Sequence, residues 1–375
     1  MSTQNINKIA LITGANMISI YCARMLFRTS YCYPFHPDFG GARKVGDTRM
    51  SEKHGELDMA EELRSELIGY CYRMMGSIFD AEDAVQDTML RVWQSWDQIR
   101  QDSSRKSWIY RIATNVCLDK LRHAKRRALP MDLSDPATII VEPRDNLPRT
   151  AWIWPAPDTA GDPADIAVSR ETIRLSFIAI LQTLPPRQRA VFILHDVFRW
   201  PAKQTADAMG MTVAAVNSTM QRARVTLTQA NLRSDALREM DVDADQRLLA
   251  CYVEAFEQYN IEKLLALFHE SGSLSMPPFV MWVCGKMKMA SFYQTTRNHC
   301  TGSRLVSVRA NGNCPAYAQY VQAGRAGVLV PWGIHILEIQ NGKIAHIHHF
   351  IDTDLFAQFG LPTYLDASMD FTANR

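Results

Sequence analysis

The chain has 375 residues, of which 47% are hydrophobic and 21% are charged, and its formal net charge is +2. This length exceeds that of one typical domain, so about two or three domains are expected. No apolar run is long enough to cross a membrane as a helix, and no membrane partner is expected. The eight cysteines form no C-x-x-C motif and no Cys/His cluster with zinc spacing. This favours reduced thiols in a cytoplasmic protein that has neither a metal site nor a cofactor.

Residues 1–55 differ in character from the rest of the chain. Residues 9–16, IALITGAN, look like the start of a dinucleotide-binding strand and turn. The glycine pattern then fails, because Met17 and Ile18 stand where further glycines and a helix start are needed. We therefore expect residues 1–55 to be a poorly ordered extension or to precede the physiological start, with a secretory signal as a weaker alternative.

The charge changes sign sharply after residue 90. Residues 51–90 hold ten acidic and three basic residues, whereas residues 91–128 hold ten basic and three acidic ones. An acidic surface suits a basic protein partner, and a basic surface suits nucleic-acid phosphates. The basic segment also contains tryptophans, whose rings suit the unstacked bases of single-stranded DNA. Of these, Trp93 is expected in the core, and Trp108 is open between core packing and support of a DNA surface.

Residues 185–227 have the pattern of a helix-turn-helix. Two prolines start one helix, residues 202–209 form a short second helix, and Gly210 ends it. Thr212 then caps a third helix, whose apolar positions recur at helical spacing. An ordinary amphipathic helix pair would have a similar pattern. The polar residues of the third helix favour DNA binding, because they are of the types that contact base edges and phosphates.

Three stretches together resemble the extracytoplasmic-function sigma factors, the promoter-recognition subunits of bacterial RNA polymerase. They are DAEDAVQDTMLRVW at 80–93, RKSWIYRIATNVCLDKLRHAKRR at 105–127, and the helix-turn-helix. The resemblance implies two all-α domains. Region 2, at 56–129, is a helical bundle that binds core polymerase and the minus-ten element, and region 4, at 169–235, binds the minus-thirty-five element. The implied partners are the clamp and flap of core RNA polymerase and promoter DNA.

The resemblance also implies roles for individual residues. Those expected to bind core polymerase are Asp80, Glu82, Asp83, Gln86, Asp87 and Arg91. Those expected to bind the minus-ten element are Trp108, Arg111, Asn115, Lys120 and Arg122. Those expected to bind the minus-thirty-five element are Thr212, Ala215, Asn217, Ser218, Gln221, Arg222 and Arg224. In this last group, we expect the arginines to anchor phosphates and Asn217, Ser218 and Gln221 to lie nearer the base edges.

Residues 130–168 are predicted to form a linker between the two helical domains. Prolines recur along it and helical periodicity vanishes, so an extended, semi-rigid chain is expected. Trp152 and Trp154 are unusual in such a segment. Because two exposed tryptophans would be unfavourable in water, we expect them to dock on another domain.

The last part of the chain, at 243–365, has helices first and strands afterwards. Residues 244–270 contain two amphipathic helices, and strand-like runs end in a hairpin around Asn341-Gly342, a type I′ turn. This order predicts an α+β domain with an antiparallel sheet. The stretches YVEAFEQYNIEKLLALFHE, MPPF and HHFIDTDLFAQFGLP resemble the SnoaL-like branch of the nuclear-transport-factor-2 (NTF2-like) superfamily, a cone-shaped fold. A subset of extracytoplasmic-function sigma factors carries such a domain, and we call it the cone.

The cone contains residues that could line a pocket. They are Trp282, His335, His346, His348 and Asp352. On a strand, His346 and His348 share one face while His349 points to the other, and a histidine pair can exchange protons near neutral pH. We favour a non-catalytic role for them, in a polar pocket or in the core. The predicted function is a sigma factor without enzyme activity whose cone modulates transcription, with a small molecule as a candidate ligand. The alternative is a fused protein in which the cone is a small-molecule isomerase or hydrolase.

Overall fold

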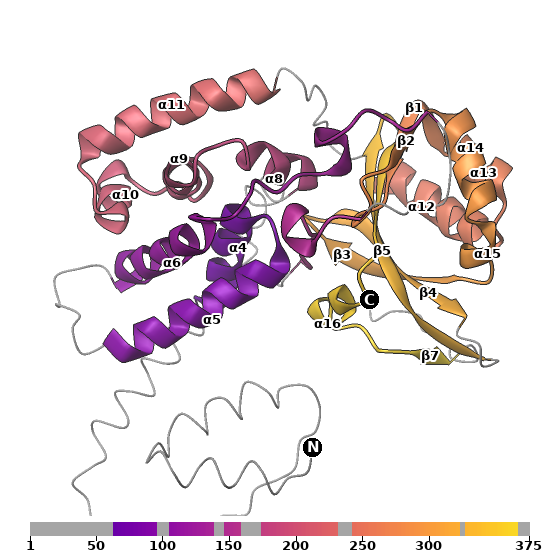
Figure 1. Cartoon of the computed structure of the whole chain (residues 1–375), viewed down its shortest axis with the longest axis horizontal. Helices are drawn as coiled ribbons and strands as arrows, with labels where there is room; N and C mark the ends of the chain where they lie inside the picture. The colour runs from indigo at the N-terminus through magenta and orange to yellow at the C-terminus, as the bar shows by residue number, and fades with distance from the viewer. Residues whose placement is uncertain are drawn as a thin grey trace, which may run out of the picture. The chain divides into compact units, whose positions relative to one another are not determined.

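The computed structural model describes residues 63–95, 105–138, 146–158, 174–231, 242–322 and 327–366. The expectation for residues 1–55 lies outside these ranges. The predicted architecture is confirmed: two all-α domains are joined by a linker, and a C-terminal α+β domain follows (Figure 1).

Region 2 contains the helices α4 (Arg64–Met75), α5 (Ile78–Ser95) and α6 (Arg105–Leu121), which pack against one another. Gly76 ends α4 in the left-handed conformation, with φ of 71°, a turn that favours glycine. Helix α5 is amphipathic, and its buried positions recur every three or four residues: Ile78, Ala81, Ala84, Val85, Thr88, Met89 and Val92. The hydroxyl groups of Tyr70 and Thr114, 2.7 Å apart, join α4 to α6 inside this bundle.

The described part of the linker is docked rather than free. It contains the short 3₁₀ helices η2 (Pro130–Asp132) and η3 (Arg149–Ala151). Trp152 and Trp154 follow, and their exposed fractions are 0% and 1%. The ring of Trp154 lies between Phe79 of α5, at a centroid distance of 6.0 Å, and Phe350 of the cone, at 5.8 Å. The two tryptophans are therefore buried where region 2 meets the cone.

Region 4 contains α8 (Leu175–Leu181), α9 (Pro186–Phe192), the π-helical turn η4 (Ile193–Val197), α10 (Ala202–Met209) and α11 (Val213–Asn231). The predicted helix-turn-helix is present. Gly210 follows α10 with φ of 60°, and the side-chain oxygen of Thr212 accepts a hydrogen bond from the backbone N–H of Ala215 at 3.2 Å.

The cone has helices on both faces of a seven-stranded sheet: most pack on the face in the interior of the cone, and the last one, Asp354–Gln358, packs on the opposite face. Its helices are α12 (Val242–Glu257), α13 (Ile261–Ala266), α14 (Lys286–Thr295), α15 (Arg297–Cys300) and α16 (Asp354–Gln358). Its strands are β1 (Phe268–Ser275), β2 (Trp282–Cys284), β3 (Arg304–Ala310), β4 (Cys314–Gln322), β5 (Val328–Gln340), β6 (Lys343–Phe350) and β7 (Leu365–Asp366).

The strand order is β2-β1-β6-β5-β4-β3, and β7 pairs with β5. Asn341 and Gly342 both have positive φ, 52° and 70°, which confirms the type I′ hairpin between β5 and β6. The sequence predicted an antiparallel sheet, but one pair differs: β1 pairs with β6 in the parallel direction. Six elements lie between β1 and β6 along the chain, so the order of the strands in the sequence could not reveal this pairing.

Each face of the sheet contributes to a hydrophobic core. On one face, Leu337 and Ile347 pack with Tyr252 and Phe256 of α12 in the interior of the cone. On the other face, residues such as Phe350 belong to the same hydrophobic core as region 2, the linker and region 4. Antiparallel sheets commonly leave one face to water. Here the outer face also contributes buried apolar residues, and Trp154 of the linker contacts it at Phe350.

Candidate polymerase and promoter interfaces

An exposed face of α5 contains the residues predicted to bind polymerase. Asp83 and Gln86 are exposed, at a spacing of three residues. The same face continues to Leu90 and Trp93, whose exposed fractions are 50% and 45%. The expectation that Trp93 lies in the core is therefore wrong. Sequence reasoning missed Leu90, although its position seven residues after Asp83 places it on the same side of the helix.

The other polymerase candidates are bound within region 2. The Asp80 carboxylate accepts from Arg127, and that of Glu82 accepts from Arg64 at 2.9 Å. Asp87 forms an ion pair with Lys120 at 2.8 Å. These pairings leave Asp83 and Gln86, together with Arg91, as the exposed polymerase candidates on this helix.

The basic residues predicted to bind the minus-ten element lie on α6 and just after it. Arg111 and Asn115 are exposed and one helical turn apart, whereas Trp108 is half-buried against the core. The carboxylate of Asp119 forms ion pairs with two arginines. They are Arg122, at 3.0 Å, and Arg91 of α5, at 3.8 Å. With the pair of Asp87 and Lys120, these contacts join the acidic side of α5 to the basic side of α6.

Helix α11 presents two exposed polar faces. Asn217, Gln221 and Arg224 border a groove of about 730 Å³, which is also lined by His195, Met220, Val225, Thr228 and Gln229. Arg224 is bound in that groove by both carboxylate oxygens of Asp196, at 2.9 and 3.2 Å. Among the residues that the structure describes, Arg222 instead donates to the hydroxyls of Ser218 and Thr219 on its own helix. The two arginines therefore differ: Arg224 is paired with an acidic side chain, whereas the described partners of Arg222 are hydroxyl groups.

The five candidate pocket residues of the cone do not meet in one place. His335 pairs with His349 across β5 and β6, and their rings stack at 3.9 Å on the inner face of the sheet. His346 and His348 lie on the opposite face, bonded to Ser273 at 2.5 Å and Ser275 at 2.8 Å. The strand periodicity predicted this separation of His349 from the other pair.

The inner histidines are buried, and His335 is held by neutral partners. Tyr252 donates to Nδ1 of His335 at 2.8 Å, and Nε2 of His335 donates to the side-chain oxygen of Gln319 at 2.8 Å. Burial, with His349 nearby, lowers the pKa of His335 well below its ordinary value. Burial, with a contribution from His348, lowers the pKa of His349 to about 3. Both rings are therefore neutral near pH 7, and their exposed fractions are 0% for His335 and 5% for His349.

The two remaining pocket candidates contact the linker. The indole N–H of Trp282 donates to the carbonyl of Ser134 at 2.8 Å, and the backbone N–H of Ala137 donates to the carbonyl of Trp282 at 2.8 Å. Asp352 pairs with Arg149 of the linker at 2.7 Å. Sequence reasoning placed both in a ligand pocket because it could not show which surface covers them.

An exposed acidic helix, a basic helix beside it and a helix-turn-helix define a DNA-binding subunit of the transcription machinery. Residues 59–127 match the family model of Sigma-70 region 2, and residues 174–227 match that of Sigma-70 region 4. The ECF RNA polymerase sigma factor SigG of Mycobacterium tuberculosis is 41% identical over 335 residues, which cover 86% of this chain and 89% of that protein. SigJ of the same organism is 30% identical over 321 residues, which cover 80% of this chain and 93% of SigJ.

The crystal structure of SigJ shares the fold, with a TM-score of 0.52 at 22% identity over 82% of this chain and 99% of that chain. The chain belongs to the extracytoplasmic-function sigma factors. It is thus a sigma factor, which binds core RNA polymerase and promoter DNA and directs the initiation of transcription. Across the described ranges, every helix is too short or too polar to pass through a lipid bilayer.

Proposed function

We propose that this sigma factor binds the polymerase clamp through the exposed face of α5, reads the minus-ten element through α6, and reads the minus-thirty-five element through α11. We further propose that the groove beside α11 faces the polymerase flap and that the cone regulates transcription by holding the linker. The protein then works in the cytoplasm, where core polymerase is, and its cone has no catalytic activity.

The observation that carries the regulatory role is a three-way junction of region 2, the linker and the cone. Asn311, in the turn between β3 and β4, is fully buried. Its side-chain N–H donates to the hydroxyl of Tyr72 in α4 at 2.7 Å, and its side-chain oxygen accepts from the backbone N–H of Ala156 at 3.1 Å. The hydroxyl of Tyr72 donates in turn to the carbonyl of Trp154 at 2.9 Å. One cone residue therefore bonds to region 2 and to the linker at the same point.

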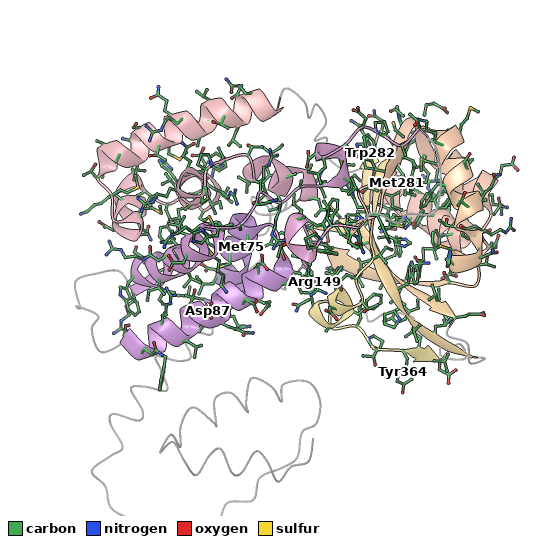
Figure 2. All side chains as sticks on the ribbon, in the orientation of Figure 1. Met75, Asp87, Arg149, Met281, Trp282 and Tyr364 are labelled. Atoms are coloured by element: carbon green, nitrogen blue, oxygen red, sulfur yellow. The ribbon has the colours of Figure 1, made fainter. Side chains whose placement is uncertain are left out.

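Charged groups hold the linker on either side of this junction. The carboxylate of Asp158 accepts from the backbone N–H groups of Gly312 and Asn313 at 2.8 and 2.6 Å. At the other end, Arg149 pairs with Asp352 and Asp354, and its guanidinium lies 4.3 Å from the ring centre of Phe79. Figure 2 labels Arg149 where the linker runs between α5 and α16. Since the linker sets the reach between the two DNA-reading domains, a domain that holds the linker biases their arrangement.

The inner histidines support the absence of catalysis. Both nitrogens of His335 have neutral hydrogen-bond partners, and the ring has no exposed surface. A general acid or base must reach the proton of a bound substrate. A small-molecule ligand of the cone would have to enter this packed interior. Such a ligand would regulate transcription only if it binds one arrangement of the linker more tightly than another.

The test is run-off transcription with core polymerase, comparing the full chain with Asp158→Asn. Replacing the carboxylate weakens the charge-assisted bonds to the cone turn and should change promoter output and expose the linker to limited proteolysis. Asp135→Asn is the matched control, because Asp135 is an exposed linker acid. If the output and the proteolysis of Asp158→Asn equal those of the control, the cone does not act through the linker.

A further inference from the structure

Two cysteines of region 2 face each other between α4 and α6. Cys71 belongs to α4 and Cys117 to α6, 46 residues further along the chain, and neither residue has any exposed surface. Their Sγ atoms lie 3.7 Å apart, and the thiol of Cys117 donates a hydrogen bond to the sulfur of Cys71. Of the six cysteines in the ranges that the structure describes, these are the two whose sulfur atoms contact each other.

The packing around this pair holds the two thiols in contact. Helices α4 and α6 lie side by side (Figure 1). The hydroxyl of Tyr70, the residue before Cys71, lies 2.7 Å from that of Thr114. One turn earlier on each helix, the hydroxyl of Tyr110 donates to the carboxylate of Glu66 at 3.2 Å. These two bonds fix the spacing of the helices, so the fold itself keeps the sulfur atoms together.

The environment of the pair slows its oxidation. The hydrogen bond from Cys117, together with burial, raises the pKa of the Cys71 thiol well above its usual value. Because an oxidant attacks the thiolate, the pair reacts only when region 2 opens locally or when the oxidant persists. Cys251, which is exposed on α12, has no such protection. The pair therefore responds to a sustained oxidant and not to a brief one.

A bond between the two sulfur atoms would displace α6. A disulfide holds its sulfur atoms about 2.0 Å apart, so the helices must leave their present packing when it forms. A close-packed interior transmits such a shift instead of absorbing it. Arg111 and Asn115 are exposed on the same helix as Cys117. Their hydrogen bonds to DNA would be lost, because the length of a hydrogen bond varies by only about half an ångström.

We infer that Cys71 and Cys117 form a redox-sensitive site, at which a peroxide produces a disulfide that impairs binding of the minus-ten element. One thiolate attacks the O–O bond of the peroxide and becomes a sulfenic acid, and an alcohol leaves, or water when the oxidant is hydrogen peroxide. The second thiol attacks the sulfenic sulfur, and water leaves as the S–S bond forms. In total the two thiols lose two protons and two electrons, and the peroxide takes up both. The inference rests on the proposed role of α6 in reading the minus-ten element.

The first measurement detects the bond itself. The full chain is treated with hydrogen peroxide, its remaining thiols are blocked with iodoacetamide in denaturant, and its peptides are analysed by mass spectrometry without reduction. We expect a linked pair of peptides that contains Cys71 and Cys117 and that disappears after treatment with dithiothreitol. If both cysteines are still fully alkylated at a peroxide dose that oxidises the exposed Cys251, the inference is wrong.

The second measurement is run-off transcription with core polymerase, which is added after the peroxide has been removed. Oxidised wild type should lose promoter output about fivefold or more, as expected for the loss of one base contact, and regain it with dithiothreitol. It should still co-purify with core polymerase. Cys71→Ala cannot form the bond and should keep its output after peroxide, and Cys117→Ala replaces it if that variant fails to fold. Cys251→Ser is the matched control and should respond as the wild type does.

One further variant separates this inference from the proposed function. Arg111→Ala, assayed without peroxide, tests whether α6 reads the promoter. If its output equals that of wild type, the role of α6 is wrong, and the effect assigned to the disulfide is wrong with it. If Arg111→Ala is impaired but the cross-linked wild type is not, only the redox-sensitive site is overturned. An equal loss of output in Cys71→Ala and wild type after peroxide would overturn it as well.

Discussion

The Nζ atom of Lys120 lies 2.8 Å from a carboxylate oxygen of Asp87, so a residue assigned to promoter DNA is paired with one assigned to polymerase. The side chains are 32% and 47% exposed. A pair this exposed contributes about 0–1 kcal/mol to stability. We predict a functional consequence from the proposed roles: when polymerase binds Asp87, Lys120 is released to bind phosphate, and the two proposed interfaces of region 2 are coupled.

We predict that Asp83→Lys and Asp87→Lys both weaken binding of core polymerase while the chain stays folded. Reversing an acidic contact introduces repulsion toward a basic partner surface. The two variants should differ in one respect. Only Asp87→Lys also changes oligothymidine binding, because Lys120 loses its partner. Co-purification with core polymerase measures the first effect, and fluorescence anisotropy measures the second.

The matched control for these variants is Glu262→Lys, which reverses an exposed acid on α13 of the cone. It changes the net charge by the same amount and should leave both measurements as in the wild type. If Asp83→Lys retains polymerase as well as Glu262→Lys does, the exposed face of α5 is not the polymerase site.

We predict that Arg222 and Arg224 make unequal contributions to binding of double-stranded promoter DNA. Arg222→Ala should weaken binding on all promoters and lower the salt slope by about one, as expected for loss of one phosphate contact. Arg224→Ala should have a smaller effect on the slope, because Asp196 already neutralises that charge. Binding measured across a salt series gives both slopes, and equal slopes for the two variants would contradict the assignment.

A separate prediction concerns base reading by the same helix. Asn217→Ala or Gln221→Ala should change the preference at one base position by roughly 1–3 kcal/mol, without a change in the salt slope. Both side chains are exposed, on the groove side of α11. Competition binding with single-base promoter variants measures this. Uniform loss on every sequence would show that these residues contact only the backbone.

Local features of the fold could be predicted from the sequence because their causes are local. The turn at Gly210, the cap at Thr212 and the hairpin at Asn341-Gly342 each depend on a few neighbouring residues, and each was confirmed. Burial of Trp152 and Trp154 was also predictable, from the cost of exposing two indole rings.

Features that depend on distant segments could not be predicted. Trp93 has the apolar character of a core residue, and only the packing of region 2 shows that it is exposed. Helix α14 was missed because its buried residues, Met289 and Phe292 among them, alternate with polar ones too briefly for a clear period. The contact of Arg111 with Asp207 joins positions 96 residues apart, and no spacing along the chain indicates it.

We predict that Trp154→Ala greatly destabilises the chain, whereas Trp93→Ala does not. Trp154 is 1% exposed and packs between region 2 and the cone, so its loss leaves a cavity at their junction. Removing a buried tryptophan costs about 3–5 kcal/mol, whereas exposed substitutions usually stay within about 0.5 kcal/mol. Chemical denaturation compares the two variants with wild type. Similar unfolding midpoints would mean that the linker is not packed at this junction.

The last prediction is that the cone loses stability in acid through the stacked pair of His335 and His349. Burial lowers both pKa values below the ordinary value of 6.5, that of His349 to about 3. At a pH between the ordinary pKa of 6.5 and the lowered pKa of each ring, the histidine binds a proton in the unfolded chain but not in the folded cone. The stability due to the neutral pair is therefore complete above about pH 6.5 and decreases as the pH falls; for His349 the decrease continues to about pH 3, by on the order of 1 kcal/mol per pH unit.

Melting temperatures measured from neutral to acid pH test this prediction. His349→Gln should flatten the pH dependence, because one titrating ring of the stacked pair is gone, whatever its effect on stability at neutral pH. His123→Gln is the control, since His123 is exposed after α6, and it should keep the wild-type slope. Equal slopes for all three proteins would show that the pair is not what makes the cone sensitive to acid, and its role would then be limited to packing.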